Sequence, residues 1–254
     1  MSSSPTTEKI RLILEQDRLW TAYALADLDP VYAEGANWFV EANAAILFYQ
    51  ALQPPVLFIY GPSDAISRLI TKVPQGPVQF MVREHSREAL MQRLAISREV
   101  EMWRMALDPK QFKPIPVNAN CRRLGPADLA PVDKLIEGQP DQPDAFSSFQ
   151  LKHGVFYGQW QDSALVAMAG THVLSKSLDV AAVGNVFTHP DYRGHGYGRK
   201  VSAAVVADLL NQGLGTIVLN VAQNNEAALK IYSDLGFWPV YGYYEGVGTI
   251  QPKK

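Results

Sequence analysis

The chain has 254 residues, of which 47% are hydrophobic and 19% are charged, and its formal net charge is −2. This composition supplies enough apolar side chain for a folded core, and the lack of excess Lys and Arg argues against a dedicated nucleic-acid binder. With one cysteine, Cys121, a polar N-terminus and no run of about 18 uncharged apolar residues, we expect a cytoplasmic protein with no disulfide, no metal centre and no membrane span.

The first part of the chain has apolar patterns that predict short strands between helices. In chain order, the expected elements are a helix at 10–28, strands at 38–41, 45–49 and 56–60, a helix at 64–71, a strand at 78–82, a helix at 86–94 and a strand at 101–107. The first helix offers Leu12, Leu19, Tyr23 and Ala26 for one apolar face. Aromatic side chains of this region are expected in its core rather than on a ligand platform: Trp20, Trp38, Phe39, Phe48, Tyr49 and Trp103.

Two proline-containing stretches, Asp108-Pro109-Lys110 and Pro114-Ile115-Pro116, interrupt any regular element near the middle of the chain. They predict a division into a first domain at 1–108, a linker at 109–116 and a second domain at 117–254.

The second half predicts an α+β fold with a mixed sheet. The expected elements are a strand at 117–124, a helix at 126–137, a loop at 138–144, a short helix at 145–151, strands at 154–160, 164–174 and 180–188, a long helix at 196–211, a strand at 216–221, a helix at 225–235 and a strand at 237–244.

A glycine-dense turn, Arg193-Gly194-His195-Gly196-Tyr197-Gly198-Arg199, joins the strand ending at Thr188 to the long helix. Glycines allow positive φ and leave no Cβ in the way of a ligand, and the first N–H groups of a helix have no partner inside it. The turn therefore predicts an anion site, with Arg193 and Arg199 as additional cations. Neither the Rossmann nor the P-loop spacing is present, and glycines that only allow tight helix–strand packing remain the alternative.

The same residues resemble the GNAT N-acetyltransferases. Residues 193–198 are similar to that family's R/Q-x-x-G-x-G/A turn, and Thr188-His-Pro-Asp-Tyr192 resembles the usual lead-in to it. Residues 221–237 are similar to the family's V-x-x-x-N-x-x-A-x-x-x-Y-x-x-x-G-F segment at every named position. The resemblance covers about 117–247 and implies the GNAT acyl-CoA N-acyltransferase fold.

The resemblance also implies a site for acetyl-CoA, the expected co-substrate. Backbone amides of the turn would hold the pyrophosphate, the backbone at Val186–Thr188 would bond the pantetheine arm, and an amide near Val186 would face the thioester oxygen. Tyr232 would be the catalytic acid that protonates the coenzyme A sulfur. The implied coenzyme-binding residues are Val186, Phe187, Thr188, Arg193, Gly194, His195, Gly196, Tyr197, Gly198, Arg199, Asn225 and Tyr232.

Several of these residues have a structural alternative. Tyr232 and Phe187 could pack in the core, and Asn225 could cap its helix. No general base is assigned: the polar residues expected nearest the cleft are Glu245, His172, His189 and Asp191. Glu245 could instead line an acceptor pocket with Tyr241, Tyr243 and Tyr244.

The first half could be a decayed duplicate of the second. When the two halves are aligned, Val82 pairs with Val221 and Ser86 with Asn225. Chance agreement between two α+β segments remains the alternative. The first half has Tyr60-Gly-Pro-Ser-Asp64 at the matching turn and Arg93 where the second has Tyr232. We expect a degenerate GNAT-like domain with a structural role, in tandem with a catalytic one.

The expected activity is transfer of the acetyl group from acetyl-CoA to a primary amine of a small molecule, an amino acid or a peptide by direct attack. Use of a longer acyl-CoA, or a non-catalytic coenzyme A-binding regulatory module, are the alternatives. We expect a monomer or homodimer. The loops at 138–149 and 174–179 and the C-terminal strand do not identify the acceptor.

Overall fold

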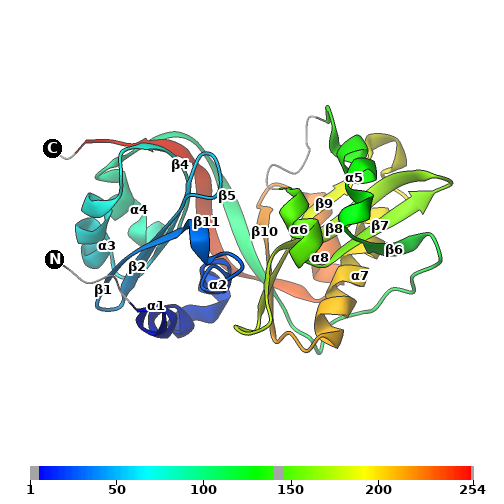
Figure 1. The fold of residues 1–254 in the computed structure, drawn as a ribbon, viewed down its shortest axis with the longest axis horizontal. Helices are drawn as coiled ribbons and strands as arrows, with labels where there is room; N and C mark the ends of the chain where they lie inside the picture. The colour runs from blue at the N-terminus through cyan, green and yellow to red at the C-terminus, as the bar shows by residue number, and fades with distance from the viewer. Residues whose placement is uncertain (1–5, 140–145, 253–254) are drawn as a thin grey trace. The chain divides into compact units, whose positions relative to one another are not determined.

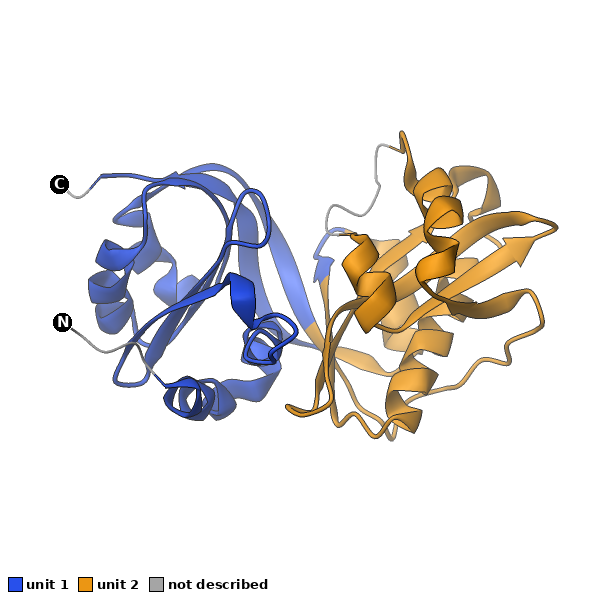
Figure 2. Cartoon of the chain, viewed as in Figure 1, with its two compact units in different colours: residues 1–104, 221–224, 239–254 blue, residues 105–220, 225–238 orange. Residues whose placement is uncertain are grey.

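The computed structural model describes residues 6–139 and 146–252, and part of the predicted loop and short helix at 138–151 lies outside them. The chain forms two compact units, shown in separate colours in Figure 2. The N-terminal unit contains Met1–Arg104, Val221–Asn224 and Pro239–Lys254, and the C-terminal unit contains Met105–Asn220 and Asn225–Trp238. The domain boundaries at 108 and 117 stay a prediction.

The N-terminal unit is built mainly from the elements of the first half of the chain (Figure 1). They are α1 (Thr7–Leu14), α2 (Arg18–Ala26), β1 (Ala36–Glu41), β2 (Ala44–Tyr49), β3 (Val56–Tyr60), α3 (Ser63–Leu69), β4 (Gly76–Val82), α4 (Glu84–Met91) and β5 (Leu94–Leu107), with 3-10 turns at Glu15–Asp17, Ala33–Gly35 and Ile70–Lys72.

The predicted helix at 10–28 is two helices, because a 3-10 turn at Glu15–Asp17 separates α1 from α2. Asp17 ends that turn and caps α2, its Oδ1 accepting the Trp20 N–H at 3.3 Å. The interruption changes which side chains face the core. Leu12, predicted on the apolar face, is 61% exposed, whereas the neighbouring Ile13 is buried.

The sheet of the N-terminal unit has the strand order β1-β2-β3-β4-β11-β5, where β11 (Phe237–Ile250) is the last strand of the chain. Strands β3 and β4 are parallel, in register from Val56↔Gln79 to Phe58↔Met81. Strand β11 runs antiparallel to β4, and its Ile250 is 1% exposed in a core cluster with side chains of β2, β3, β4, α3 and α4. The sheet of the N-terminal unit therefore includes a strand from the C-terminal end of the sequence.

The C-terminal unit holds the elements of the second half (Figure 1). They are β6 (Cys121–Leu124), α5 (Leu129–Ile136), α6 (Ser148–His153), β7 (Phe156–Gln161), β8 (Ala164–Ser175), β9 (Val180–Thr188), α7 (Tyr197–Asn211), β10 (Thr216–Ala222) and α8 (Glu226–Asp234), with 3-10 turns at Pro126–Asp128 and Pro190–Tyr192.

The sheet of this unit has the order β10-β9-β8-β7-β6. Strands β6 to β9 are antiparallel neighbours, whereas β10 is parallel to β9. A core cluster joins side chains of the sheet to α5 and α6, and it includes Leu135, Leu151, Phe156 and Met168. This is the predicted α+β fold with a mixed sheet, and it places the β9-to-α7 connection at the end of a buried strand.

Several element boundaries differ from the prediction. Strand β6 begins at Cys121 rather than at 117, and β11 continues past 244 to Ile250. Of the aromatic residues predicted in the core, Trp20 and Phe48 are buried and the other four are half-buried. Within the two described stretches of chain, no helix is long and apolar enough to cross a membrane.

Candidate functional site

The turn between β9 and α7 contains two glycines in the left-handed region, Gly194 with φ +81° and Gly196 with φ +74°. This region favours glycine because a Cβ strains the backbone there. A Cβ built on either residue would have no neighbouring atom within 4 Å. The space beside both glycines is therefore open, as a ligand cradle requires.

The first turn of α7 directs unpaired backbone donors toward that space. The first backbone bond of the helix runs from the Lys200 N–H to the Gly196 carbonyl at 3.0 Å. The N–H groups of Tyr197, Gly198 and Arg199 precede it, no side chain caps this end, and no acidic residue lies in the first turn. Because the helix dipole is positive at its N-terminus, these amides favour an anion.

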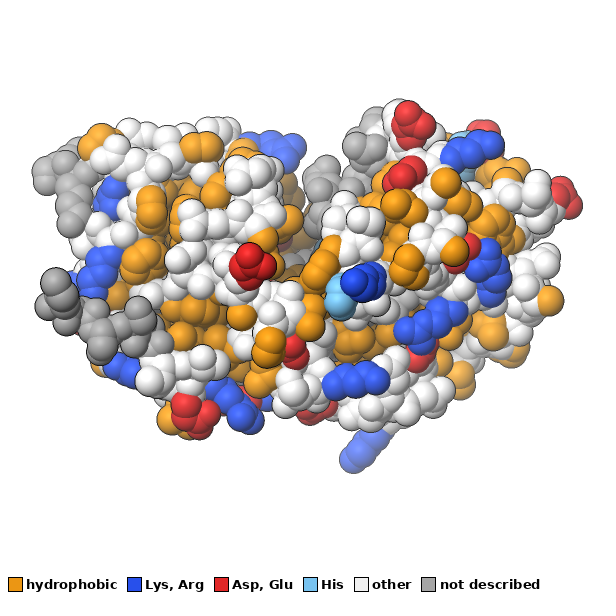
Figure 3. Space-filling view, viewed as in Figure 1, with side chains coloured by type: hydrophobic (Ala, Val, Ile, Leu, Met, Phe, Trp, Pro, Cys, Tyr) orange, Lys and Arg blue, Asp and Glu red, His pale blue; other side chains and the backbone are white. Residues whose placement is uncertain are grey.

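The two predicted arginines are held differently. Arg193 donates from Nε to the Thr188 carbonyl at 3.1 Å, and its guanidinium lies 5.9 Å from the centre of the Phe187 ring. Arg199 has its Nε 3.9 Å from a carboxylate oxygen of Asp234 on α8. Figure 3 shows one face of the C-terminal unit, on which basic and acidic side chains are interspersed. Positive charge at the turn thus comes mainly from Arg193 and the helix end.

The other turn residues form a small stacked group. The His195 ring stacks on Tyr197, with 5.6 Å between ring centres and 17° between planes. The Tyr197 hydroxyl accepts a hydrogen bond from the Gln161 side chain. These contacts hold the side chains of His195 and Tyr197 to one another and leave the backbone amides of the turn as its exposed donors.

The three segments that contain the sequence motifs come close together at Gly198. A Cβ there would lie 3.2 Å from Thr188 Oγ1 and 3.9 Å from Ile231 Cδ1. The end of β9, the start of α7 and the middle of α8 therefore meet at this glycine. Gly198 thus allows close packing, whereas Gly194 and Gly196 leave space beside the turn, and the anion site stays a prediction.

Strand β9 contains a bulge directly before the predicted pantetheine-binding backbone. Its register with β8 shifts between Gly170↔Gly184 and Met168↔Phe187, which leaves an extra residue on β9, and Asn185 has φ +51°. The parallel pairing with β10 ends at Val183↔Leu219. Beyond this point β9 has no partner on its β10 side among the strands that the structure describes. The backbone groups of β9 that do not pair with β8 therefore face that unpaired side. The Phe187 side chain itself is buried in the core cluster.

Three polar side chains support the bulge, and only His172 among them was predicted to lie near the cleft. The Asn185 N–H donates to His172 Nε2 at 3.3 Å, and the His172 ring fills the space where Gly184 would carry a Cβ. Asn185 Nδ2 donates to Gln150 Oε1 at 3.1 Å. The Gly184-Asn185 pair inside an apolar strand was the signal for a bulge.

Asn185 also has an unused acceptor at the bulge. Its side chain is 4% exposed, and its Oδ1 is buried with no hydrogen-bond partner among the residues that the structure describes. A buried acceptor without a partner is costly, so this oxygen is suited to a water or a ligand donor.

Tyr232 on α8 is 7% exposed, and burial raises its pKa to about 12. Its ring packs edge-on against Phe237 at 6.1 Å. The phenol is therefore both a packing residue and a group that keeps its proton at neutral pH. Asn225 caps α8, its Oδ1 accepting the Ala228 N–H at 3.1 Å.

Three of the residues considered as general bases have hydrogen bonds of their own. His189 Nδ1 accepts the Asp191 N–H at 3.3 Å, as a turn residue does. Glu245 belongs to the N-terminal unit and accepts a hydrogen bond from the Tyr243 hydroxyl at 2.7 Å. In the same unit, the Tyr241 hydroxyl donates to Asp17 Oδ1 at 2.9 Å. His172 Nε2 is already an acceptor for the bulge.

The glycine of the corresponding turn in the N-terminal unit has no open space at its Cβ position. Gly61 has φ +126°, but a Cβ on it would lie 2.5 Å from the Ala44 Cβ. Pro62, which has no N–H, is the N-cap of the short helix α3, and Asp64 lies in its first turn. Arg93, aligned with Tyr232, is buried and donates from Nη1 to the carbonyls of Ile70 and Val73, each at 3.0 Å.

Known proteins resemble this chain in both sequence and fold. The model of the acetyltransferase (GNAT) family matches residues 128–237. The chain is 32% identical over 106 residues to ribosomal protein bS18-alanine N-acetyltransferase of Escherichia coli strain K12, a match that covers 42% of this chain and 70% of that protein. It is 38% identical over 79 residues to mycothiol acetyltransferase of Rhodococcus jostii strain RHA1, covering 30% of this chain and 26% of that protein. A tandem GNAT protein from the clavulanic acid biosynthesis pathway has the same fold, with a TM-score of 0.60 and 13% identity over 98% of both chains.

Proposed function

The chain belongs to the acetyltransferase (GNAT) family, and from this premise we propose that it transfers the acetyl group of acetyl-CoA to a primary amine of a small molecule, an amino acid or a peptide. The family uses acetyl-CoA as its co-substrate, and the chain is an acyltransferase. The observation that carries the proposal is the open space beside Gly194 and Gly196 at the positive end of α7.

The residues at this turn fit a diphosphate. A phosphate oxygen accepts backbone N–H groups readily, and the absence of a Cβ at Gly194 and Gly196 lets it approach them. In the proposal, the amides from Gly194 to Arg199 bind the pyrophosphate and Arg193 adds a charge-assisted contact. Asn225, whose Nδ2 is not used by its cap, contacts the pantetheine arm.

The backbone of β9 beyond the bulge would bind the pantetheine arm as an added strand does. The proposed groups are the peptide groups of Val186, Phe187 and Thr188. The bulge supports this role because β9 leaves β10 there, with their pairing ending at Val183↔Leu219, while its pairing with β8 resumes at Phe187. The Val186 amide is proposed to donate to the thioester oxygen, which gains negative charge as the acceptor amine attacks.

Direct attack forms a carbon–nitrogen bond, breaks the carbon–sulfur bond and releases a thiol. The attacking nitrogen loses one proton and the sulfur gains one. We assign the second step to the Tyr232 hydroxyl, which keeps its proton at neutral pH because burial raises its pKa to about 12. The proton from the nitrogen passes to water in this scheme, since His172, His189 and Glu245 accept other hydrogen bonds.

The amine class is supported by the named activities of the relatives. One is named as an N-acetyltransferase of an alanine of a ribosomal protein, and another is named as a mycothiol acetyltransferase.

The test is release of free thiol from acetyl-CoA in the presence of amines. A panel containing amino acids, peptides with a free N-terminus and small primary amines is incubated with the chain, and acetylated products are identified by mass spectrometry. Amine-dependent thiol release with an N-acetyl product is the expected result. Tight binding of acetyl-CoA without turnover of any amine would instead identify a binding module, and turnover only with a longer acyl-CoA would change the donor.

A further inference from the structure

The N-terminal unit contains a cavity of its own, about 340 Å³ in volume. It lies where the parallel strands β3 and β4 end: Tyr60 is the last residue of β3, and Arg83 directly follows β4. The register between these strands stops at Phe58↔Met81, so they separate toward the cavity. The carboxyl ends of separating parallel strands are a general location for ligand sites.

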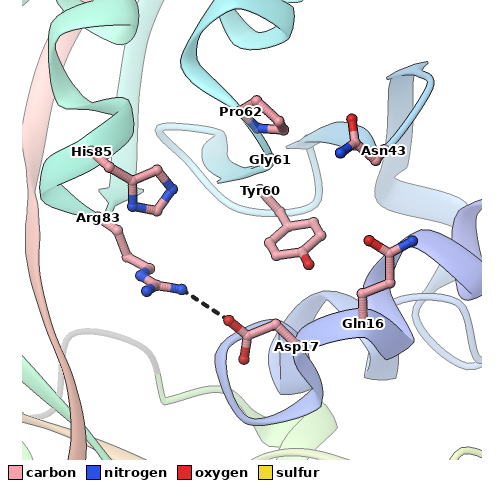
Figure 4. A pocket seen from close by; sticks show the side chains of 8 residues that line it. All are labelled: Gln16, Asp17, Asn43, Tyr60, Gly61, Pro62, Arg83 and His85. Atoms are coloured by element: carbon pink, nitrogen blue, oxygen red, sulfur yellow. Dashed lines mark hydrogen bonds and ion pairs between the residues drawn. The ribbon is translucent and has the colours of Figure 1, made fainter.

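The cavity is polar and is formed by segments far apart in the sequence (Figure 4). Figure 4 shows the side chains of Gln16, Asn43, Tyr60 and Arg83 directed toward a common space above Asp17. The complete lining is Gln16, Asp17, Asn43, Tyr60, Gly61, Pro62, Arg83 and His85.

One wall carries a charged pair that is held rigidly. Arg83 Nη1 donates to Asp17 Oδ2 at 2.8 Å, and the two side chains are 26% and 17% exposed. The Arg83 guanidinium lies 4.1 Å from the centre of the Tyr241 ring, and the Tyr241 hydroxyl donates to Asp17 Oδ1 at 2.9 Å. The N–H of Trp20 also donates to that oxygen. Both charges are therefore fixed in position before any ligand arrives.

Each member of the pair has hydrogen-bonding capacity left. A guanidinium has five donors, and in residues 6–139 and 146–252 that of Arg83 has no hydrogen bond other than the one to Asp17. A carboxylate accepts about four hydrogen bonds, and Asp17 receives three. An anion can therefore bind Arg83, and a cation can bind Asp17, without breaking the pair.

The remaining walls supply neutral polar groups. The side chains of Gln16, Asn43 and Tyr60 have no hydrogen-bond partner in the part of the chain that is described. Burial, followed by the Asp17 carboxylate, raises the pKa of Tyr60, so its hydroxyl stays a donor. Burial and the charge of Arg83 lower the pKa of His85, so the imidazole does not add a second cation.

The chemistry of the cavity selects against a diphosphate. Pro62 removes a backbone donor at the start of α3, and the Asp17 carboxylate in the lining repels a multivalent anion. A simple carboxylate at Arg83 would also lie close to Asp17. A ligand with both charges avoids this repulsion, because its ammonium faces Asp17 while its carboxylate faces Arg83.

We propose that this cavity binds a free α-amino acid, with its carboxylate on Arg83, its ammonium on Asp17 and its side chain toward Gln16, Asn43 and Tyr60. All lining residues of this cavity belong to the N-terminal unit, whereas the turn and Tyr232 proposed for acetyl transfer belong to the C-terminal unit. In this proposal, the N-terminal unit binds a ligand of a different class from acetyl-CoA.

The experiment is isothermal titration calorimetry on the full chain with each of the common L-α-amino acids. For an amino acid that binds, the N-acetyl derivative and the carboxamide derivative are titrated next. Each derivative lacks one of the two charges, so both are expected to bind at least about tenfold more weakly. Equal binding of either derivative would overturn the proposal, as would the absence of binding by every amino acid.

Variants then locate the binding. Arg83→Gln is expected to weaken amino acid binding at least about tenfold, and so is Asp17→Asn, which keeps an N-cap for α2. The matched control is Arg87→Gln: Arg87 is also 26% exposed, pairs with Glu99 at 2.6 Å and stacks on Tyr244 at 4.9 Å, but lies outside the cavity. Unchanged affinity in both cavity variants, or equal loss in the Arg87 control, would contradict the proposal.

Discussion

Both units pass from a parallel strand into a helix through a turn that contains glycine with positive φ, yet the two turns use glycine for different reasons. At Gly61, Ala44 already occupies the space that a Cβ would need. At Gly194 and Gly196 nothing within 4 Å occupies it. A glycine turn is thus a ligand cradle only where the fold leaves the space beside it empty.

The residues that follow the second parallel strand show the same contrast. Tyr232 is buried with a hydroxyl that has no hydrogen-bond partner in the described parts of the chain, whereas Arg93 at the aligned position bonds backbone carbonyls around it. In the C-terminal unit, the side chain at this position has a hydroxyl that the described part of the fold does not use. In the N-terminal unit, the side chain at the aligned position links backbone segments.

The largest expected effect comes from closing the open turn. Gly196→Asp is expected to weaken acetyl-CoA binding at least about 1000-fold, because a carboxylate would occupy the space proposed for a diphosphate. Calorimetry with acetyl-CoA measures this. The control is Gly213→Asp at the other end of α7, where φ is +82° and no atom lies within 4 Å, so the backbone cost is matched. Similar losses in both variants would mean that strain, not ligand contact, is responsible.

The second expected effect is on stability and concerns Arg93. Arg93→Met removes hydrogen bonds to the carbonyls of Ile70, Thr71, Val73 and Gln251, and those to Ile70 and Val73 are buried. We expect the free energy of unfolding to fall by about 3 kcal/mol, measured by urea denaturation, with acetyl-CoA affinity unchanged. The exposed Arg98→Met should cost less than about 0.5 kcal/mol. A loss of affinity in Arg93→Met would place this residue in the coenzyme site.

The third effect is on turnover. Tyr232→Phe is expected to lower kcat about 100-fold with unchanged acetyl-CoA affinity, because the proposed proton donor is lost. Tyr157→Phe, which removes a hydroxyl 3.2 Å from Asp208 in the same unit, serves as the control and should retain kcat. An unaltered kcat in Tyr232→Phe would remove the phenol from the mechanism.

The same variant tests the raised pKa. The folded chain keeps the Tyr232 proton to about pH 12, whereas the unfolded chain loses it above the ordinary value of 10.0. The stability from the neutral phenol is therefore complete below pH 10 and is lost as pH rises toward 12. Over that window, the wild type should lose about 1.4 kcal/mol per pH unit more than Tyr232→Phe. Parallel curves in alkaline denaturation would contradict the shift.

The smallest expected effect is at the β9 bulge. His172→Leu removes the acceptor for the Asn185 N–H, so the following amides lose their fixed direction and kcat should fall about tenfold with little change in KM for acetyl-CoA. His172→Gln retains an acceptor and should restore most of kcat. Failure of Gln to restore activity that Leu removes would indicate that the ring, not the hydrogen bond, matters.

The sequence predicted the order of helices and strands well because the periodicity of each element is local. Strand β9 and the start of α7 followed from an apolar run bounded by Pro190 and the glycines. The break between α1 and α2 could not be predicted in this way, because Asp17 acts as a cap only when the chain turns there.

In the candidate site, too, features local in the sequence could be predicted and features that depend on tertiary contacts could not. Its backbone donors follow from glycine spacing, which one segment of sequence contains. The supporting cluster of Gln150, His172 and Asn185 comes from a helix and two strands and appears only when the bulge brings them together. The Arg83–Asp17 pair joins residues 66 positions apart and had no local signal.

The position of β11 in the sheet determines when the N-terminal unit can complete its folding during translation. This strand lies between β4 and β5, yet it is translated after the whole of α8. A nascent chain that has already emerged through β5 still lacks the strand that separates β4 from β5, and Ile250 is not yet available to its core. The N-terminal unit therefore completes its sheet last, and a premature stop codon after α8 would damage the half of the protein that the ribosome produced first.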